Sequence, residues 1–118
     1  MKKCLPVDEL GLLQTDHFVA KLEGTYQIRS HGDFIIQVAE DDRVNFPTQT
    51  GRSFPFAPTV DWRQGGPIVE NNGISIEKVS TGWRAHCGEA AVGTGSTPLI
   101  AAMRTRVKLK YGAEVEVE

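Results

Sequence analysis

The sequence predicts one α+β domain over residues 1–118, in which a mainly antiparallel sheet packs against helices as a layered sandwich. Three observations lead to this prediction. The chain has 118 residues, which suits one domain with one core. Apolar residues recur at helical spacing near residues 7–23 and 97–111. Two pairs of short alternating segments, separated by turn residues, predict antiparallel hairpins.

The stretch LPVDELGLLQTDHFVAKLEG predicts the first helix. Its apolar side chains between Val7 and Leu22 recur at helical spacing, and Gly24 suits the C-terminal stop. Thr15 and Asp16 could cap a restart of the helix. One helix and two short helices are therefore both open at this point.

Two alternating segments then predict a hairpin. Its strands come from the runs TYQIRS and DFIIQVAE, in which apolar residues alternate over 26–28 and 34–38, and a tight turn spans residues 30–33. Residues 40–58 are rich in proline and predict a long surface loop with one short edge strand near Arg52–Phe54, because proline is excluded from interior strands. Ordered and disordered forms of this loop are both open.

The segment VDWRQGGPIVENN, residues 60–72, predicts a kinked or two-part helix. A cap at Thr59 or Asp61 would start it. The Gly-Gly-Pro run that begins at Gly65 would break the helix and restart it, since proline suits a first helical position. Gly73 would end the second part.

The last part of the chain predicts a second hairpin, a glycine-rich loop and a long helix. Residues 74–79 and 82–88 alternate as paired strands do. The loop GTGSTP leads into a helix over residues 97–111, whose inner face includes Met103 and Val107. The tail AEVEVE suits a short edge strand.

Charge and hydropathy exclude some classes of protein. A net charge of −2 argues against general nucleic-acid binding, which normally requires a basic excess. No apolar run approaches the roughly 18 residues of a membrane helix. The start, MKKCLPVDELG, lacks the pattern of a secretory signal. We therefore expect no membrane association, a reducing cytoplasm, and free thiols at Cys4 and Cys87.

Two helix starts carry the candidate binding residues. Their glycines and hydroxyls could present backbone N–H groups to an anion, Trp62 offers a stacking face, and Arg63 or Arg104 offers a planar cation. If the two starts converge, they suit a phosphate joined to an aromatic base. Ordinary capping and helix packing explain the same residues without a ligand. Lys108 and Lys110 are expected to be solvated. The predicted ligand-binding residues are Asp61, Trp62, Arg63, Gln64, Gly65, Gly66, Gly95, Ser96, Thr97 and Arg104.

The sequence contains no complete catalytic or metal-binding motif, so we expect a non-enzymatic protein with no cofactor and no metal ion. The adjacent His86 and Cys87 would point to opposite faces of a strand. Their spacing fits no metal site. The alternative that stays open is a small enzyme that acts on a nucleotide-like substrate through His86 or Cys87.

Several blocks of the sequence resemble the NinX-like family of tailed-phage proteins. They are VDELG, TDHFVAKLEG, TVDWRQGGPIVENNGISIE, GWRAH and GSTPLIAAMRTRVKLKYGAEVEV. The resemblance covers nearly the whole chain except residues 26–58, and its last blocks are the most specific. It implies a phage domain of the α-β-α sandwich type and a small accessory protein made inside an infected bacterium. The family is one of unknown function, so the resemblance implies no activity.

The residues and the resemblance together lead to an expectation about function. We expect a phage accessory protein that binds a host protein or a small anionic, nucleotide-like ligand in the cytoplasm of the infected host. Countering a host defence is the process that this expectation favours. A homo-oligomer is left open.

Overall fold

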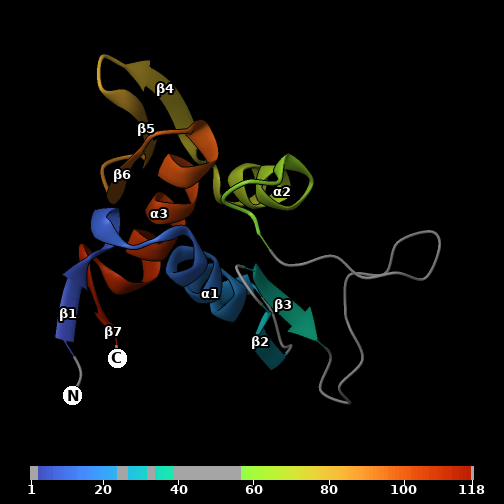
Figure 1. Ribbon diagram of the computed structural model, residues 1–118. Helices are drawn as coiled ribbons and strands as arrows, with labels where there is room; N and C mark the ends of the chain where they lie inside the picture. Colours follow the sequence, from blue (N-terminus) through green and yellow to red (C-terminus); the bar gives the residue numbers. More distant parts are fainter. Residues whose placement is uncertain (1–2, 24–26, 32–33, 39–56, 118) are drawn as a thin grey trace.

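The protein is described here by a computed structural model, which covers residues 3–23, 27–31, 34–38 and 57–117 (Figure 1). Its elements in chain order are β1 (Lys3–Pro6), the 3-10 turn η1 (Val7–Glu9), α1 (Leu12–Glu23), β2 (Gln27–His31), β3 (Phe34–Val38), α2 (Trp62–Asn72), β4 (Ser75–Val79), β5 (Gly82–Cys87), β6 (Ala91–Gly95), α3 (Pro98–Tyr111) and β7 (Glu114–Val117). The α+β class predicted from the sequence is confirmed.

All strand pairs in the described residues are antiparallel, but they form three separate sheets instead of the single sheet expected. One sheet has the order β4-β5-β6, a second pairs β1 with β7, and a third pairs β2 with β3. The two predicted hairpins correspond to β2-β3 and β4-β5. The strands β1 and β6 were not predicted from the sequence.

Helix α3 lies at the centre of the molecule, in contact with β5 and β6 on one side and with α1 and α2 on others (Figure 1). The sequence predicts one apolar face on this helix, with Met103 and Val107 inside, and both are fully buried. Burial extends further than one face, because neighbours surround the helix. Its buried residues are Leu99, Ile100, Ala101, Ala102, Met103, Thr105 and Val107.

Strand β6 replaces the glycine-rich loop predicted before α3, and its glycines explain the difference. A Cβ atom placed on Gly93 would lie 2.6 Å from the carbonyl oxygen of Ala101 and 2.7 Å from the backbone nitrogen of Thr105. One on Gly95 would lie 2.8 Å from the nitrogen of Ala101. The missing side chains therefore let the backbone of α3 lie directly on β6, a tertiary role that local sequence does not reveal.

Helix α1 begins later than predicted. The chain makes the short turn η1 first, and α1 starts at Leu12. Thr15 and Asp16 do not cap a restart; both are buried inside α1, and the Thr15 hydroxyl donates to the carbonyl oxygen of Gly11 at 2.9 Å. The predicted stop at Gly24 lies outside the described residues.

Helix α2 is continuous, although the sequence predicts a break at the glycine pair. Gly65 and Ile68 are buried on its inner side, and this packing outweighs the poor helix propensity of Gly66 and Pro67. Gly73 ends the helix in the left-handed conformation with φ of 63°, as predicted.

Most of the predicted proline-rich loop, with its edge strand near Arg52–Phe54, lies outside the described residues. So does the centre of the predicted turn in the first hairpin. Of the loop, residues 57 and 58 are described, and they are buried in a turn that leads into α2. None of the described helices has the length and apolar character needed to cross a membrane.

Candidate functional site

The structure brings the starts of α2 and α3 together. A Cβ atom on Gly65, in the first part of α2, would lie 2.7 Å from Cδ2 of Leu99, in the first turn of α3. It would also lie 2.6 Å from the carbonyl oxygen of Pro58. Gly65 is therefore the contact point of the two helix starts. Its role is close packing, since no space remains there for a ligand.

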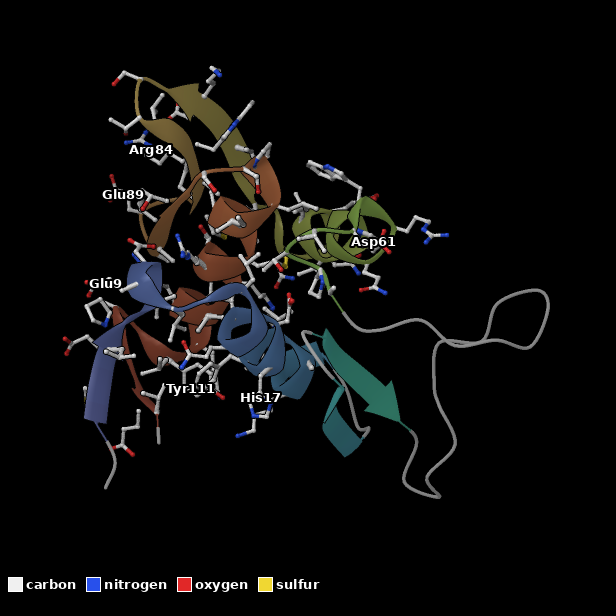
Figure 2. All side chains as sticks on the ribbon, viewed as in Figure 1. Glu9, His17, Asp61, Arg84, Glu89 and Tyr111 are labelled. Atoms are coloured by element: carbon white, nitrogen blue, oxygen red, sulfur yellow. The ribbon has the colours of Figure 1, made fainter. Side chains whose placement is uncertain are left out.

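The start of α2, marked by Asp61 in Figure 2, carries three exposed residues. The side chain of Trp62 is 54% exposed and that of Val60 is 57% exposed. The side chain of Arg63 is 72% exposed and lies 3.5 Å from the carboxylate of Asp61. We call Val60, Trp62 and Arg63 the α2 start surface.

The other predicted residues of α2 serve the helix itself. The carboxylate of Asp61 accepts a hydrogen bond from the backbone nitrogen of Arg63 at 2.9 Å, so Asp61 is the N-cap that the sequence predicts. The side-chain oxygen of Gln64 accepts from the backbone nitrogen of Ala57 and thereby ties the preceding turn to the helix. Gln64 is therefore turned toward the protein's own backbone.

At the start of α3, as at the start of α2, a capping side chain occupies a backbone N–H group. Thr97 is its N-cap, and its hydroxyl accepts from the backbone nitrogen of Ile100 at 3.2 Å. Pro98 has no N–H to offer. Gly95 belongs to β6 and packs on α3, and Ser96, which follows it, is exposed.

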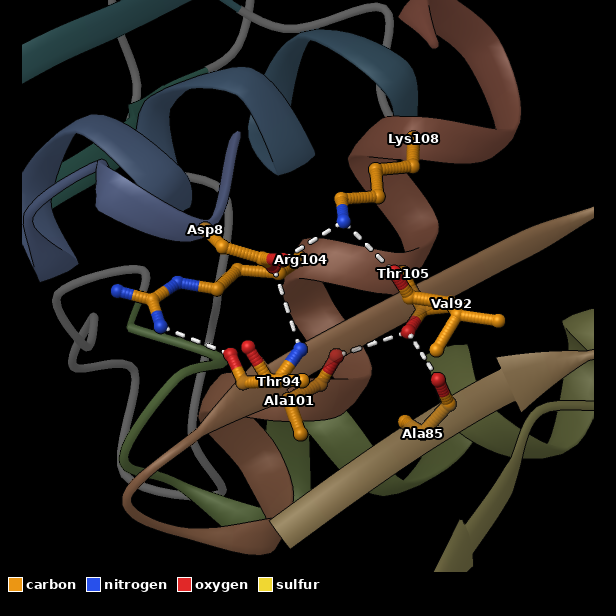
Figure 3. Close-up of polar contacts among 8 residues, drawn as sticks. All are labelled: Asp8, Ala85, Val92, Thr94, Ala101, Arg104, Thr105 and Lys108. Atoms are coloured by element: carbon orange, nitrogen blue, oxygen red, sulfur yellow. Dashed lines mark hydrogen bonds and ion pairs between the residues drawn. The ribbon is translucent and has the colours of Figure 1, made fainter. Parts of the chain in front are cut away.

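Arg104 lies in a polar cluster that covers the outer edge of β6 (Figure 3). Its guanidinium donates to the carbonyl oxygens of Thr94 and Leu10, both at 2.8 Å. Burial lowers the pKa of Arg104, and the nearby Asp8 carboxylate opposes that shift. Arg104 therefore joins three segments of the fold, whereas the sequence predicts that it reaches a ligand.

Lys108 completes this cluster, so the prediction of a solvated lysine is wrong. Its ammonium lies 2.8 Å from Asp8 and 2.7 Å from the carbonyl oxygen of Val92, and its side chain is only 15% exposed. Asp8 also accepts from the backbone nitrogen of Thr94 at 3.2 Å. These side chains occupy backbone groups of an edge strand that would otherwise be open to another chain.

A buried carboxylate supports the turn beneath the α2 start surface. Asp16 of α1 accepts from the backbone nitrogen of Thr59 at 3.0 Å and from the Thr59 hydroxyl at 2.9 Å. Both residues are almost fully buried. Burial raises the pKa of Asp16 to about 6, although the two hydrogen bonds favour its charged form. Asp16 thus fixes the backbone next to Val60 from inside the protein.

This pKa predicts a pH-dependent stability. Because the folded pKa of Asp16 lies above the ordinary value of 3.8, the folded state holds the proton more tightly, and stability from this group is lost as the pH rises from about 4 through 6. Asp16→Asn removes the titration. The unfolding free energy of the wild type relative to this variant is expected to fall by roughly 2–3 kcal/mol between pH 4 and pH 7 in urea titrations. A constant difference across that range would contradict the assignment.

The two residues of the enzymatic alternative do not form a pair. His86 and Cys87 are neighbours on β5, and adjacent strand residues point to opposite faces. The half-buried thiol of Cys87 donates to the carbonyl oxygen of Asn72 at 3.3 Å. Cys4 is exposed on β1, in a different sheet. Within the residues that the structure covers, no group of three or more acidic, histidine or cysteine side chains is placed to hold a metal ion.

The predicted site residues did not include Val60, Asp8 or Thr59, although Thr59 was a candidate cap. Val60 is the first residue of the predicted segment 60–72, and it is exposed and apolar, a combination visible only once the turn is known. Asp8 and Thr59 take part in contacts across 86 and 43 positions. No local pattern signals such contacts.

Comparison with known protein families identifies a family for this chain. The family model described as Bacteriophage P22, NinX matches residues 7–110 of the chain. No curated protein matches the chain.

Proposed function

The chain belongs to the bacteriophage P22 NinX family, and on that premise we propose that it is a phage accessory protein that acts, without catalysis, by binding a protein of the infected host. The observation that carries the proposal is the α2 start surface, where Val60, Trp62 and Arg63 stand within four positions of the chain and are all exposed. Tryptophan and arginine are enriched among the residues that dominate binding energy at protein interfaces.

The backbone that presents this surface is held in place from three sides. Asp16 fixes Thr59 from below, Gln64 fixes the turn at Ala57, and Asp61 caps the helix. A surface that is ordered before binding loses little conformational entropy when a partner arrives. This arrangement supports a binding role for the turn.

A protein partner fits the electrostatics better than a small anion does. At the start of α2, the backbone N–H of Arg63 donates to the carboxylate of Asp61, and a negative cap disfavours a second negative group there. At the start of α3, the hydroxyl of Thr97 already accepts from Ile100. A small anionic, nucleotide-like ligand is therefore the second candidate, supported by the nearby Trp62 ring and Arg63 guanidinium.

The class of target that we propose is a component of a host defence, met in the cytoplasm of the infected cell. A protein that binds its target without converting it acts stoichiometrically, since each copy blocks one target molecule. This mode of action suits inhibition of a defence component. Expression of the chain in a panel of host strains should then restore plating of a phage that one of those defences restricts.

The binding proposal is tested by affinity capture from lysate of a phage-infected host. Wild-type protein is expected to retain a specific host protein, and Trp62→Ala is expected to weaken that complex at least tenfold, as removal of a central aromatic residue does. Val92→Ala is the matched control, because Val92 is an apolar side chain that is 40% exposed on β6. The control should bind as the wild type does.

Three other outcomes would count against the proposal. Equal capture by Trp62→Ala and wild type would place the interface elsewhere. In a parallel titration with a panel of nucleotides, recovery of an intact bound nucleotide would support the second candidate. Recovery of an altered nucleotide would show the enzymatic alternative.

A further inference from the structure

The outer face of α2 carries residues that the helix itself does not favour. This face, which we call the outer α2 face, consists of Arg63, Gly66, Pro67 and Glu70. These positions fall on one side of the helix because they are separated by three, four and seven residues. Gly65 and Ile68, by contrast, are buried on the inner side.

The fold does not require a glycine at position 66. A Cβ atom placed there meets no atom within 4 Å, whereas one at Gly65 would clash with both neighbouring segments. Glycine and proline are the two least favourable residues in a helix interior. Gly66 and Pro67 therefore weaken α2, and for Gly66 the packing of the monomer gives no reason. Together they place no long side chain in the middle of the face.

The charges of the face are also placed unfavourably with respect to the helix dipole. Arg63 lies in the first turn and Glu70 in the last, while the first turn holds no acidic residue and the last no basic one. The helix dipole favours the opposite arrangement. In the monomer Arg63 lies near Asp61 at 3.5 Å, a pair so exposed that it contributes little.

The pattern is symmetric about the point between Gly66 and Pro67. Arg63 lies three residues before Gly66, and Glu70 lies three residues after Pro67. When two such helices pack antiparallel across a two-fold axis at that point, Arg63 of each copy faces Glu70 of the other. The small centre then allows the two backbones to approach closely.

We propose that the outer α2 face pairs with the same face of a second copy of this chain, which makes the protein a two-fold symmetric dimer. The charge complementarity selects this partner, because a two-fold interface uses one patch twice and must be complementary to itself. The dimer then gives one explanation for the four residues that are unfavourable for helix α2, which are Arg63, Gly66, Pro67 and Glu70. Trp62 and Val60 flank the contact, so the dimer leaves these two residues of each α2 start surface exposed, while Arg63 takes part in the contact. This inference does not depend on the proposed host target.

Sedimentation velocity over a concentration series tests the dimer with charge reversals. The wild type is expected to approach twice the monomer mass as its concentration rises toward about 1 mM. Arg63→Glu and Glu70→Arg should each raise the dissociation constant at least tenfold, because like charges then face each other. Both changes agree with the helix dipole, so both variants are expected to fold.

A mixture of the two variants gives the decisive result. In an equimolar mixture, the glutamate introduced by Arg63→Glu in one variant faces the arginine introduced by Glu70→Arg in the other. The unchanged Glu70 of the first variant and the unchanged Arg63 of the second also face each other, so a heterodimer of wild-type affinity is expected. Gly66→Ala should fold well and dimerise more weakly. A wild type that stays monomeric throughout, single variants that dimerise like the wild type, or a mixture that stays monomeric would each overturn the proposal.

Discussion

Gly93→Ala is expected to destabilise the protein by about 3–5 kcal/mol, a large part of the stability of a small domain. The added methyl group would lie 2.6 Å from the carbonyl oxygen of Ala101 and the hydroxyl of Thr105. The Thr105 hydroxyl oxygen lies 3.0 Å from the carbonyl oxygen of Ala85 and 2.9 Å from that of Ala101, and its one hydrogen is shared between these two acceptors (Figure 3). A shift of this hydroxyl would therefore break these contacts. The clash of the added methyl group is relieved only if α3 shifts away from the sheet.

Urea unfolding followed by circular dichroism measures this effect, and Gly66→Ala is the matched control. Its methyl group meets no atom within 4 Å, and alanine favours a helix by about 1 kcal/mol over glycine. The control should therefore raise the unfolding free energy. If Gly93→Ala lost less than about 1 kcal/mol, the direct contact between β6 and α3 would be wrong.

Met103→Ala is expected to lower the unfolding free energy by roughly 3–5 kcal/mol. The Met103 side chain is fully buried at the centre of α3, in one core cluster with Val7, Val19 and Val107. Truncation removes apolar contacts from several elements at once, and packing on both sides of α3 limits how far the cavity can collapse.

The same urea titration tests this change against an exposed site. Val92→Ala removes apolar atoms from a side chain that is 40% exposed, and its effect should stay within about 0.5 kcal/mol. An equally small effect for Met103→Ala would show that α3 does not lie in the core.

The parts of the fold that sequence could predict are those with a strong local signal. The alternation in residues 74–87 predicts β4 and β5, and the capped apolar segment at residues 97–111 predicts α3. Gly73 was predicted as a helix stop because its left-handed conformation is a local property. In each case the deciding interactions lie within a few residues of each other.

The parts that sequence could not predict depend on distant contacts. The segment AVGTG looks like a loop, because glycine weakens a strand, yet Gly93 is needed where α3 crosses β6. Gly66 and Pro67 look like a break, yet burial of the inner side keeps α2 intact. The sequence predicts a solvated Lys108, but in the fold Asp8 of η1 lies 2.8 Å from its ammonium group.

The candidate site shows the same limit. The sequence left open whether the starts of α2 and α3 converge, and in the structure Gly65 of α2 lies against Leu99 of α3. Which residues stay exposed could not be predicted, since Gln64 and Arg104 turn to backbone groups that lie on other segments. The ligand-binding role of Trp62 and Arg63 remains a prediction.

Site-specific photocrosslinking in infected cells tests whether the α2 start surface binds a host protein. A photoreactive amino acid replaces Val60 in one version of the protein, which keeps Trp62 in place, and Val92 in another, since both residues are exposed and Val92 lies on a different segment, β6. We expect a covalent adduct with one host protein from position 60 and none with that protein from position 92. Adducts from neither position, or the same adduct from both, would contradict the claim that the α2 start surface binds a host protein.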